Sequence, residues 1–174
     1  LIEHTIRGLS DVRIGIINGD TAGYDGDAQR AQQAGGMAVH INTGGNCHLE
    51  AHMIRDGLSH LDLSALDVVI IENVGNLVCP AGWKLGTHHN VLVASIPEGA
   101  DKPYKYPNMY HGVDVLVINK IDLLPYIPFD MDYFKQGVMA LNPQVTIFEV
   151  SCQTGQGIDA WTDWVRDTAS TVTL

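Results

Sequence analysis

Two cysteines and a histidine form the first group of residues whose chemistry suggests a site. Cys47 and His48 are adjacent, and Cys79 lies further along the chain, directly before a proline. Thiolate sulfur and imidazole nitrogen bind Zn²⁺ and Ni²⁺ in preference to Mg²⁺. Adjacent side chains point to opposite faces of a strand, so Cys47 and His48 can share a metal only from a turn, which residues 43–46 are suited to form. Three ligands leave one position of a four-coordinate metal free for a water or for a ligand from a second subunit. The alternative to a metal site is that both cysteines are buried structural thiols.

The segment Asn119-Lys120-Ile121-Asp122 follows the apolar run VDVLVIN at residues 113–119. Its N-K-x-D pattern is typical of GTP-binding domains. The Asp122 carboxylate can accept hydrogen bonds from the N1 and N2 donors of guanine. Adenine lacks this pair, so the pattern predicts GTP or GDP rather than ATP. Lys120 is expected to lie along the base and Asn119 to tie neighbouring loops together. A turn that merely ends a strand is the alternative.

Ser151 and Cys152 follow the last apolar run. GTP-binding domains often carry Ser-Ala at this place, where a backbone N–H meets the guanine O6 atom. Cysteine is also small, so both residues are predicted to belong to the nucleotide site. The Cys152 side chain is expected to be a packed thiol rather than a metal ligand.

Several acids stand at the ends of apolar runs. Glu72 ends the run LDVVIIE, and Gly75 follows shortly after it. This segment resembles the D-x-x-G segment of GTPases, in which the acid holds Mg²⁺ through water and the glycine N–H approaches the γ-phosphate. Asp20 closes an earlier run and Asp27 follows in the next loop, so both are predicted to reach Mg²⁺ or an attacking water. Helix N-capping is the alternative for Asp25 and Asp27.

These residues are separated by short apolar runs that alternate with amphipathic stretches. Runs that are apolar on both faces suit parallel strands covered by helices. The pattern predicts an α/β fold with a doubly wound, mostly parallel sheet and helices on both faces, in a single domain over residues 1–174. The predicted strands are 12–18, 38–42, 66–72, 91–96, 113–119 and 145–150. The predicted helices are 1–9, 27–34, 49–61, 131–141 and 158–170, with long loops at 79–90 and 97–107.

Composition limits the classes of partner. The formal net charge of −10 argues against nonspecific nucleic-acid binding and against docking on an anionic membrane. Three cysteines are too few, and odd in number, for a disulfide framework. No apolar run has the length of a membrane helix, and no signal peptide is visible, so we expect a cytoplasmic protein.

Five segments together resemble the HypB family of hydrogenase nickel-incorporation GTPases: GNCHLEAHM (45–53), IENVGNLVCP (71–80), EGADKPYKYP (98–107), NKIDLLP (119–125) and TGQGIDAWTDW (154–164). The resemblance implies a GTP- and Mg²⁺-dependent metallochaperone that delivers nickel to hydrogenase. It implies a Ni²⁺ or Zn²⁺ site at Cys47, His48 and Cys79, and a homodimer formed through the nucleotide and metal face. The implied partners are other hydrogenase maturation proteins and the hydrogenase large subunit. A urease-type nickel GTPase fits the segment at 72–80 less well.

The sequence departs from that family in one important respect. It contains no G-x-x-G-x-G-K-S/T phosphate-binding segment, so we expect a P-loop GTPase-like domain that lacks its first strand and phosphate loop. The chain as given is then expected to be inactive as a GTPase, although the family consists of GTPases. The alternative function is a metal- and partner-binding module without GTPase activity.

The spacing of Gly75 and Cys79 predicts a link between nucleotide and metal. Cys79 follows Gly75 too closely for an independent hinge, so a loop that responds to the γ-phosphate should move Cys79 as well. Cys47 and His48 lie on a different loop and need not follow.

Overall fold

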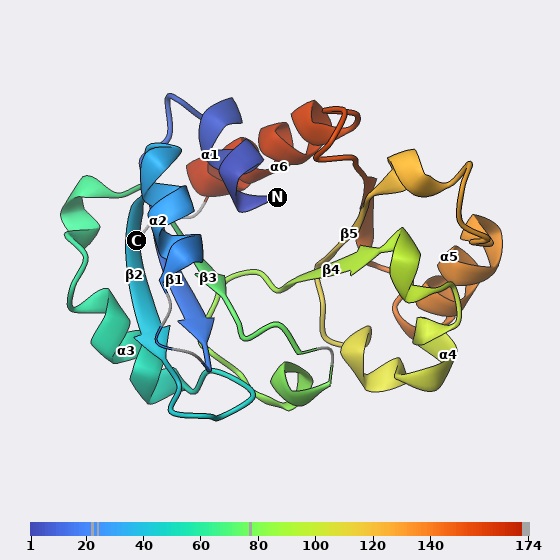
Figure 1. Ribbon diagram of the computed structural model, residues 1–174, viewed down its shortest axis with the longest axis horizontal. Helices are drawn as coiled ribbons and strands as arrows, with labels where there is room; N and C mark the ends of the chain where they lie inside the picture. The colour runs from blue at the N-terminus through green and yellow to red at the C-terminus, as the bar shows by residue number, and fades with distance from the viewer. Residues whose placement is uncertain (22, 24, 77, 172–174) are drawn as a thin grey trace. The chain divides into compact units, whose positions relative to one another are not determined.

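The computed structural model describes residues 1–21, 23, 25–76 and 78–171. The chain divides into two compact units: Leu1–Gly86 together with Thr162–Leu174, and Thr87–Trp161. Each unit contains a three-stranded parallel sheet with helices packed against it (Figure 1). The predicted α/β fold with parallel strands is therefore confirmed.

The first unit contains a sheet with the strand order β2-β1-β3. Its elements are α1 (Ile2–Gly8), β1 (Ile14–Asp20), α2 (Gly26–Gln33), β2 (Met37–Asn42), α3 (Ala51–Leu58), the 3-10 turn η1 (Leu63–Ala65), β3 (Val68–Glu72) and the 3-10 turn η2 (Cys79–Gly82). In the parallel register, Asn18 lies opposite both His40 and Glu72. The carboxyl ends of all three strands therefore meet at one edge, where sites form in sheets of this kind.

Neighbouring residues of β1 face opposite sides of this sheet. Ile16 points toward α1 and α2, because a Cβ added at Gly36 would lie 2.6 Å from Ile16 and 3.1 Å from Ile6. Ile17 points to the other side, where it packs with Leu49 and Ile54 of the segment that leads through α3. This alternation is the two-residue period of a strand, and it gives the sheet helices on both faces.

Gly19 creates the space that Leu49 fills. A Cβ at Gly19 would lie 2.6 to 2.7 Å from three side-chain carbons of Leu49, which is completely buried. The residue directly after the Cys47-His48 pair is thus packed against the end of β1. This packing fixes where the loop carrying the two predicted ligands returns to the sheet.

The second unit contains a sheet with the order β4-β5-β6. Its elements are β4 (Val91–Ser95), η3 (Ile96–Glu98), α4 (Lys102–Lys105), η4 (Pro107–Met109), β5 (Val115–Asn119), η5 (Ile121–Leu123), α5 (Met131–Leu141), β6 (Thr146–Glu149) and the start of α6 (Ile158–Thr171). The first four residues of β5 are all buried, as expected for a central parallel strand. Helix α5 buries Phe134 and Val138, and Asp130 caps it by accepting a hydrogen bond from the Tyr133 N–H at 2.9 Å.

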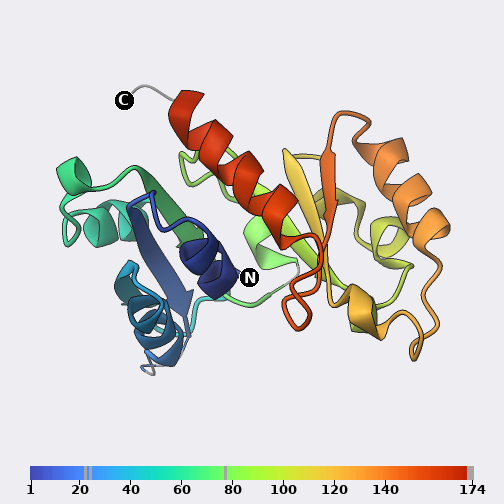
Figure 2. The same cartoon turned by 90° about the horizontal axis from the view of Figure 1, so that it is seen from above.

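From Thr162 onward, α6 belongs to the first unit. Figures 1 and 2 both show this part of α6 beside α1. The contact is close, because a Cβ at Gly8 would lie 3.0 Å from the Thr162 methyl group. The Arg166 guanidinium also bonds the Asp11 carboxylate, at 3.2 and 3.3 Å. Helix α6 is thereby held against α1 and the residues that follow it.

All six predicted strands and all five predicted helices are present, with bounds that differ by a few residues. Two findings differ from the prediction. The stretch 97–107 is not a plain loop, because it contains the short helix α4 and the start of η4. The strands also form two sheets instead of one. Strands β1, β2 and β3 pair with one another, strands β4, β5 and β6 pair with one another, and no hydrogen-bonded pairing joins the two sets among the described residues.

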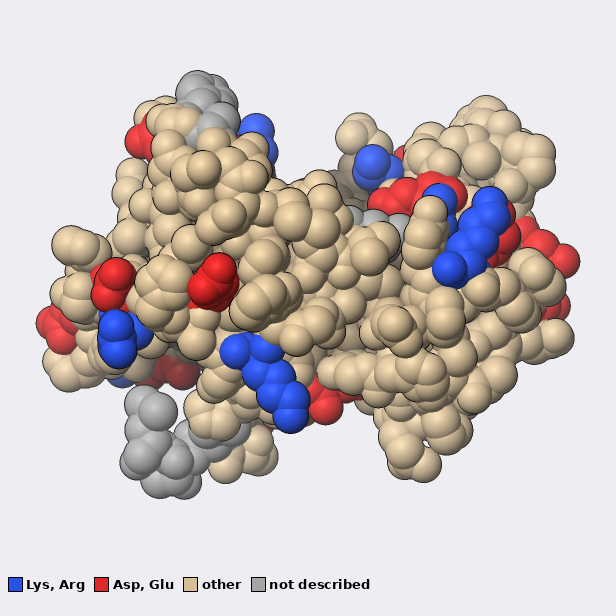
Figure 3. Space-filling model, turned by 90° about the horizontal axis from the view of Figure 1, so that it is seen from below, with Lys and Arg blue, Asp and Glu red and all other residues tan. Residues whose placement is uncertain are grey.

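Several charged side chains of the described residues form ion pairs at the surface. Arg13 forms a bidentate salt bridge with Asp67, in which Nε donates to Oδ2 at 2.9 Å and Nη2 donates to Oδ1 at 2.6 Å. This interaction lowers the pKa of Asp67 to about 2. Figure 3 shows scattered Lys and Arg side chains, several of them beside Asp or Glu, without a continuous basic area among the described residues in view. In the described part of the chain, no helix combines the length and the apolar character needed to cross a bilayer.

Candidate functional site

The predicted metal ligands Cys47, His48 and Cys79 all lie in the first unit, and the structure brings them together. The Cys47 Sγ atom is 3.8 Å from His48 Nδ1. The Cys79 thiol lies close enough to Cys47 that this neighbour, together with some burial, raises the pKa of Cys79. Donors bound to one tetrahedral metal through bonds of the Zn–S and Zn–N lengths lie about 3.6 Å apart, so the sulfur–nitrogen distance fits a shared ion.

The fit is not complete in this arrangement. Among the described residues, no three Cys, His, Asp or Glu side chains already surround a common point at coordination distance. The neighbouring Cys47 raises the pKa of Cys79, which favours its thiol form, whereas a metal binds the thiolate forms. Metal binding at these residues therefore requires a local rearrangement of side chains.

The His48 ring is covered on one face by an aromatic side chain. It stacks on the Trp83 ring with a centroid separation of 4.3 Å and an interplanar angle of 15°. Its Nε2 atom is buried and has no hydrogen-bond partner among the described residues. The nearest acidic oxygen is Glu50 Oε1 at 3.8 Å, and the other oxygen of Glu50 lies 3.3 Å from His52 Nδ1. A buried N–H without a partner costs roughly 1–3 kcal/mol, so this nitrogen marks a site whose contacts are incomplete.

The predicted turn before Cys47 is present. Gly44 and Gly45 have φ angles of 64° and 95°, which glycine adopts without strain. The Gly44 N–H donates to Asn42 Oδ1 at 2.9 Å, and the Thr43 hydroxyl donates to the Asn46 carbonyl at 2.7 Å. This bonding brings Cys47 and His48 out of the strand geometry that would point them apart.

Two asparagines connect the segment after β3 to the ligands. Asn73 Oδ1 accepts from the N–H groups of Leu49, at 2.8 Å, and of Val74, at 2.9 Å. Asn76 Oδ1 accepts from the Cys79 N–H at 3.1 Å. That the Cys47-His48 loop need not follow Cys79 stays a prediction, which these static contacts do not test. A hydrogen bond ties the residue after His48 to the same segment that carries Cys79.

Glu72 is part of a polar row that crosses the first sheet. Its Oε2 atom accepts from Asn18 Nδ2 at 2.7 Å, and Asn18 Oδ1 lies 3.1 Å from His40 Nδ1. The three residues are paired directly in the parallel register. Burial raises the pKa of Glu72, while the Asn18 hydrogen bond acts in the opposite direction. The row holds the predicted Mg²⁺-associated acid in one orientation.

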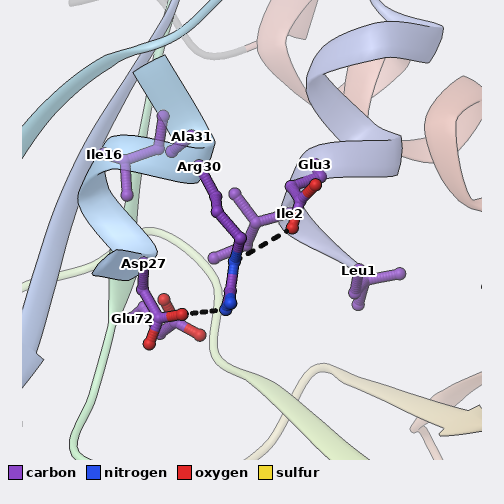
Figure 4. A pocket seen from close by; sticks show the side chains of 8 residues that line it. All are labelled: Leu1, Ile2, Glu3, Ile16, Asp27, Arg30, Ala31 and Glu72. Carbon is purple, nitrogen blue, oxygen red and sulfur yellow. Dashed lines mark hydrogen bonds and ion pairs between the residues drawn. The ribbon is translucent and has the colours of Figure 1, made fainter. Parts of the chain in front are cut away.

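Glu72 and Asp27 also line a cavity of about 90 Å³ in the first unit (Figure 4). Within it, Arg30 forms ion pairs with Asp27 and with Glu3, so the Asp27 carboxylate is already neutralised. Asp20 lies outside the group of residues that line this cavity, and its Oδ1 accepts from the Thr21 N–H at 2.6 Å.

The structure does not support the capping alternative for Asp25 and Asp27. Asp25 stands at the N-cap of α2 but makes no side-chain cap bond, and its carboxylate accepts from Gln29 at 2.6 Å instead. Asp27 lies inside the first turn of α2 and pairs with Arg30 across one helical turn. The i, i+3 spacing explains this pairing, since such residues are neighbours on a helix surface.

Gly75 lies beside open space. A Cβ at this position would meet no atom within 4 Å, and its φ angle is not in the left-handed region. The described protein atoms therefore do not require glycine here. A ligand phosphate close to the backbone is one reason for glycine at such a position.

The predicted guanine-binding residues lie together in the second unit. The Ser151 hydroxyl donates to Asp122 Oδ1 at 2.5 Å, which fixes the carboxylate that is predicted to read the base. Asn119 Oδ1 accepts from the Cys152 N–H at 3.3 Å, so Asn119 ties the two loops as expected. Cys152 is partly buried. The backbone N–H that is predicted to meet guanine O6 belongs to this Ser151-Cys152 segment.

Lys120 has an unusual backbone. Its φ angle is positive, at 62°, and no other non-glycine residue that the structure describes has a positive φ. A side chain in this left-handed region costs on the order of 1 kcal/mol, and the cost is tolerated where the surroundings fix the backbone. Here the Lys120 N–H donates to Asn119 Oδ1 at 2.7 Å. Backbone strain of this kind is concentrated at binding sites.

Comparison with known proteins shows the family to which this chain belongs. The family model described as "CobW/HypB/UreG, nucleotide-binding domain" matches residues 1–149. The hydrogenase maturation factor HypB of Methanocaldococcus jannaschii, a probable assignment, is 37% identical over 99% of this chain and 78% of its own length. The chain belongs to the HypB family. HypB of Azotobacter vinelandii is 42% identical over 95% of this chain, but the chain spans only 55% of that relative's length.

Solved HypB structures have the same fold. The crystal structure of HypB from Helicobacter pylori in complex with nickel has a TM-score of 0.91 and 31% identity, and covers 99% of this chain and 84% of that one. HypB from Archaeoglobus fulgidus has a TM-score of 0.87 and 37% identity, with 97% and 82% covered. The match confirms the α/β architecture along nearly the whole chain.

Sequence reasoning missed four residues of this HypB-family chain that contact or lie near the predicted site residues. Trp83 and Glu50 surround His48, and Asn18 and His40 orient Glu72. For Glu50 the available signal was its position two residues after His48. For Asn18 and His40 the signal was a polar residue near the end of an apolar strand.

Proposed function

We propose that this protein is a GTP-dependent nickel metallochaperone for the maturation of nickel–iron hydrogenase, in which GTP binding and hydrolysis are coupled to metal delivery. The observation that carries this proposal is the convergence of Cys47, His48 and Cys79 in one unit of a HypB-family fold. Soft sulfur and imidazole donors suit Ni²⁺ and Zn²⁺. The nickel complex of the Helicobacter pylori relative supports the same cargo.

The nucleotide part of the proposal assigns guanine recognition to Asn119, Lys120, Asp122, Ser151 and Cys152. Asp122 is fixed by Ser151 and is the residue that selects guanine. Gly75 approaches the γ-phosphate, Glu72 holds Mg²⁺ through water, and Asp20 and Asp27 contribute to the Mg²⁺ or water environment. Asp27 can do so only by giving up its ion pair with Arg30.

The metal site is tested by titrating the 174-residue chain with Ni²⁺ under reducing conditions, in competition with a chromophoric chelator. We expect one high-affinity equivalent with thiolate-to-nickel charge-transfer absorption in the near ultraviolet. Cys79→Ser should lose most of this absorption and affinity. Cys152→Ser is the matched control, since Cys152 lies in the second unit, and it should bind nickel as the parent does. Equal binding by the parent and Cys79→Ser would remove Cys79 from the site.

The nucleotide assignment is tested by comparing GDP with ADP in binding competition. The parent should prefer GDP, and Asp122→Asn should reduce this preference, because an amide cannot accept both guanine donors. An unchanged preference in Asp122→Asn would contradict the assignment. Asp132→Asn is the matched control, because Asp132 is an exposed acid on α5 of the same unit, and this variant should keep the parent's preference for GDP.

A metal- and partner-binding module without GTPase activity is the second candidate function. It is supported by the proximity of Cys47 Sγ and His48 Nδ1, because these donors could bind a metal without nucleotide hydrolysis. Phosphate release from GTP in the presence of Mg²⁺ distinguishes the two functions. Appreciable turnover by the 174-residue chain would exclude this second function, whereas release at the background level would exclude GTP hydrolysis by this chain as part of the first.

The remaining parts of the proposal concern assembly. We propose a homodimer formed through the nucleotide and metal face, a cytoplasmic location, and contacts with other hydrogenase maturation proteins and the hydrogenase large subunit. Sedimentation with and without a nonhydrolysable GTP analogue and Ni²⁺ tests the dimer, and an unchanged monomer under all conditions would refute it.

A further inference from the structure

The surroundings of His48 distinguish its two ring nitrogens. Nδ1 lies 3.8 Å from Cys47 Sγ, on the side of the candidate ligands. Nε2 is buried, has no hydrogen-bond partner among the described residues, and lies 3.8 Å from Glu50 Oε1. The ring therefore has a sulfur beside one nitrogen and a carboxylate beside the other.

We propose that Glu50 and Trp83 are positioning residues that present His48 Nδ1, rather than Nε2, to the metal and thereby set the affinity for nickel. This inference rests on the proposed metal site at Cys47, His48 and Cys79. It assigns the nitrogen and the supporting residues, which that proposal leaves open. Glu50 and Trp83 do not touch the ion themselves.

The argument for Glu50 is one of hydrogen bonding. A histidine that binds metal through one nitrogen carries a proton on the other, and this N–H is usually held by a carboxylate or carbonyl group. With Nδ1 as ligand, the Nε2–H of His48 faces Glu50. The separation of 3.8 Å exceeds a hydrogen bond, so the carboxylate must move closer by about 0.8 Å. Its other oxygen is next to His52, at 3.3 Å, which holds Glu50 near the ring.

The argument for Trp83 is one of ring orientation. The near-parallel stack, with an interplanar angle of 15°, covers one face of the imidazole and restricts rotation of its plane. Trp83 also follows η2 (Cys79–Gly82) directly, and its N–H donates to the Pro80 carbonyl at 3.1 Å. The stack therefore joins the short turn that begins with Cys79 to the ring of His48. It keeps two ligands from different loops close together.

The experiment uses the 174-residue chain and measures Ni²⁺ affinity by chelator competition in four variants. Glu50→Ala removes the acceptor, whereas Glu50→Gln keeps an oxygen that can accept from Nε2–H. Trp83→Leu removes the stack, whereas Trp83→Phe keeps an aromatic face. The controls are Asp56→Ala, an exposed acid on α3, and Tyr126→Leu, an aromatic side chain that is 81% exposed.

We expect Glu50→Ala and Trp83→Leu each to weaken Ni²⁺ binding by ~10–100-fold, with much smaller losses in Glu50→Gln and Trp83→Phe. Both controls should bind as the parent does. Affinities of Glu50→Ala and Trp83→Leu equal to those of the controls would overturn the inference while leaving the nickel site intact. Failure of the parent chain to bind Ni²⁺ would instead refute the proposed site, and this inference with it.

A second measurement remains informative even if an alanine or leucine variant fails to fold. Long-range ¹H–¹⁵N spectra of histidine-labelled parent protein loaded with diamagnetic Zn²⁺ report which nitrogen of His48 bears the metal and which bears a proton. We expect metal on Nδ1 and a proton on Nε2 in both the parent and Glu50→Gln. Metal on Nε2 would overturn the inference whatever the affinities are.

Discussion

The packing of Leu49 against Gly19 gives a prediction that joins core packing to the metal site. Substituting Gly19→Ala places a methyl group 2.6 to 2.7 Å from three carbons of Leu49. Ordinary contacts begin near 3.4 Å, so the nearest carbon of Leu49, at 2.6 Å, must move by at least about 0.8 Å. Leu49 is completely buried, and overpacking of this kind costs roughly 1–3 kcal/mol. The movement also strains the Leu49–Asn73 hydrogen bond and shifts His48, so nickel affinity should fall although Gly19 is no ligand.

A double-mutant cycle with Leu49→Ala tests this reasoning. Leu49→Ala alone should lower the free energy of unfolding by about 2–5 kcal/mol, because it leaves a cavity in the core. In the double variant, the methyl group added by Gly19→Ala enters that cavity and finds no side chain to displace. The double variant should therefore be more stable than the sum of the single effects predicts, by at least about 1 kcal/mol.

The assay is equilibrium unfolding in urea, followed by circular dichroism, for the parent, both single variants and the double variant. Gly82→Ala is the matched control, since a Cβ there meets no atom within 4 Å, and its effect should stay within about 0.5 kcal/mol. Effects of Gly19→Ala and Leu49→Ala that add to within about 0.5 kcal/mol would refute the proposed steric contact.

Two further predictions concern hydrogen bonds elsewhere in the first unit. Asn73→Ala leaves the buried Leu49 N–H without its acceptor and should cost about 1–3 kcal/mol in urea unfolding, with weaker nickel binding. Asn73→Asp keeps an acceptor oxygen, so equal losses in both variants would exclude this hydrogen bond as the cause. Arg13 lowers the pKa of Asp67 to about 2 from 3.8, so its stabilisation is complete above the higher value and is lost as the pH falls through the lower one. Asp67→Asn should therefore lower the urea midpoint at pH 7 but have little effect near pH 2, and an equal loss at both values would contradict the ion pair.

The elements of this chain could be predicted because their hydrophobic pattern is strong. The run that became β5 is buried on both faces, and its continuous apolar sequence indicates a central strand without any tertiary information. Strand β1 begins at Ile14 rather than at the predicted Val12. The Arg13 backbone and side chain are instead engaged by Asp67, which is remote in sequence. Helix α4 has only four residues, too few to show a helical period.

The candidate site was predictable only in part, for a different reason. Residue types and turn-forming glycines indicated Cys47, His48 and Cys79. The stack of Trp83 on His48 depends on how two loops meet, and no spacing within either loop encodes it. Similarly, Asn73 belongs to a recognised motif, but its bond to Leu49 becomes visible only when β1 and β3 are in register.

The hydrogen bond from Leu49 to Asn73 has a consequence for attempts to transplant this site. A synthetic peptide that spans the Cys47-His48 loop would contain two ligands but not the acceptor that holds the loop's backbone. A peptide that spans Cys79 would contain Asn73 and Trp83 but not the ring that Trp83 stacks on. Neither segment is a self-sufficient module for grafting. A miniature mimic would need both segments on a scaffold that reproduces the spacing of two parallel strands.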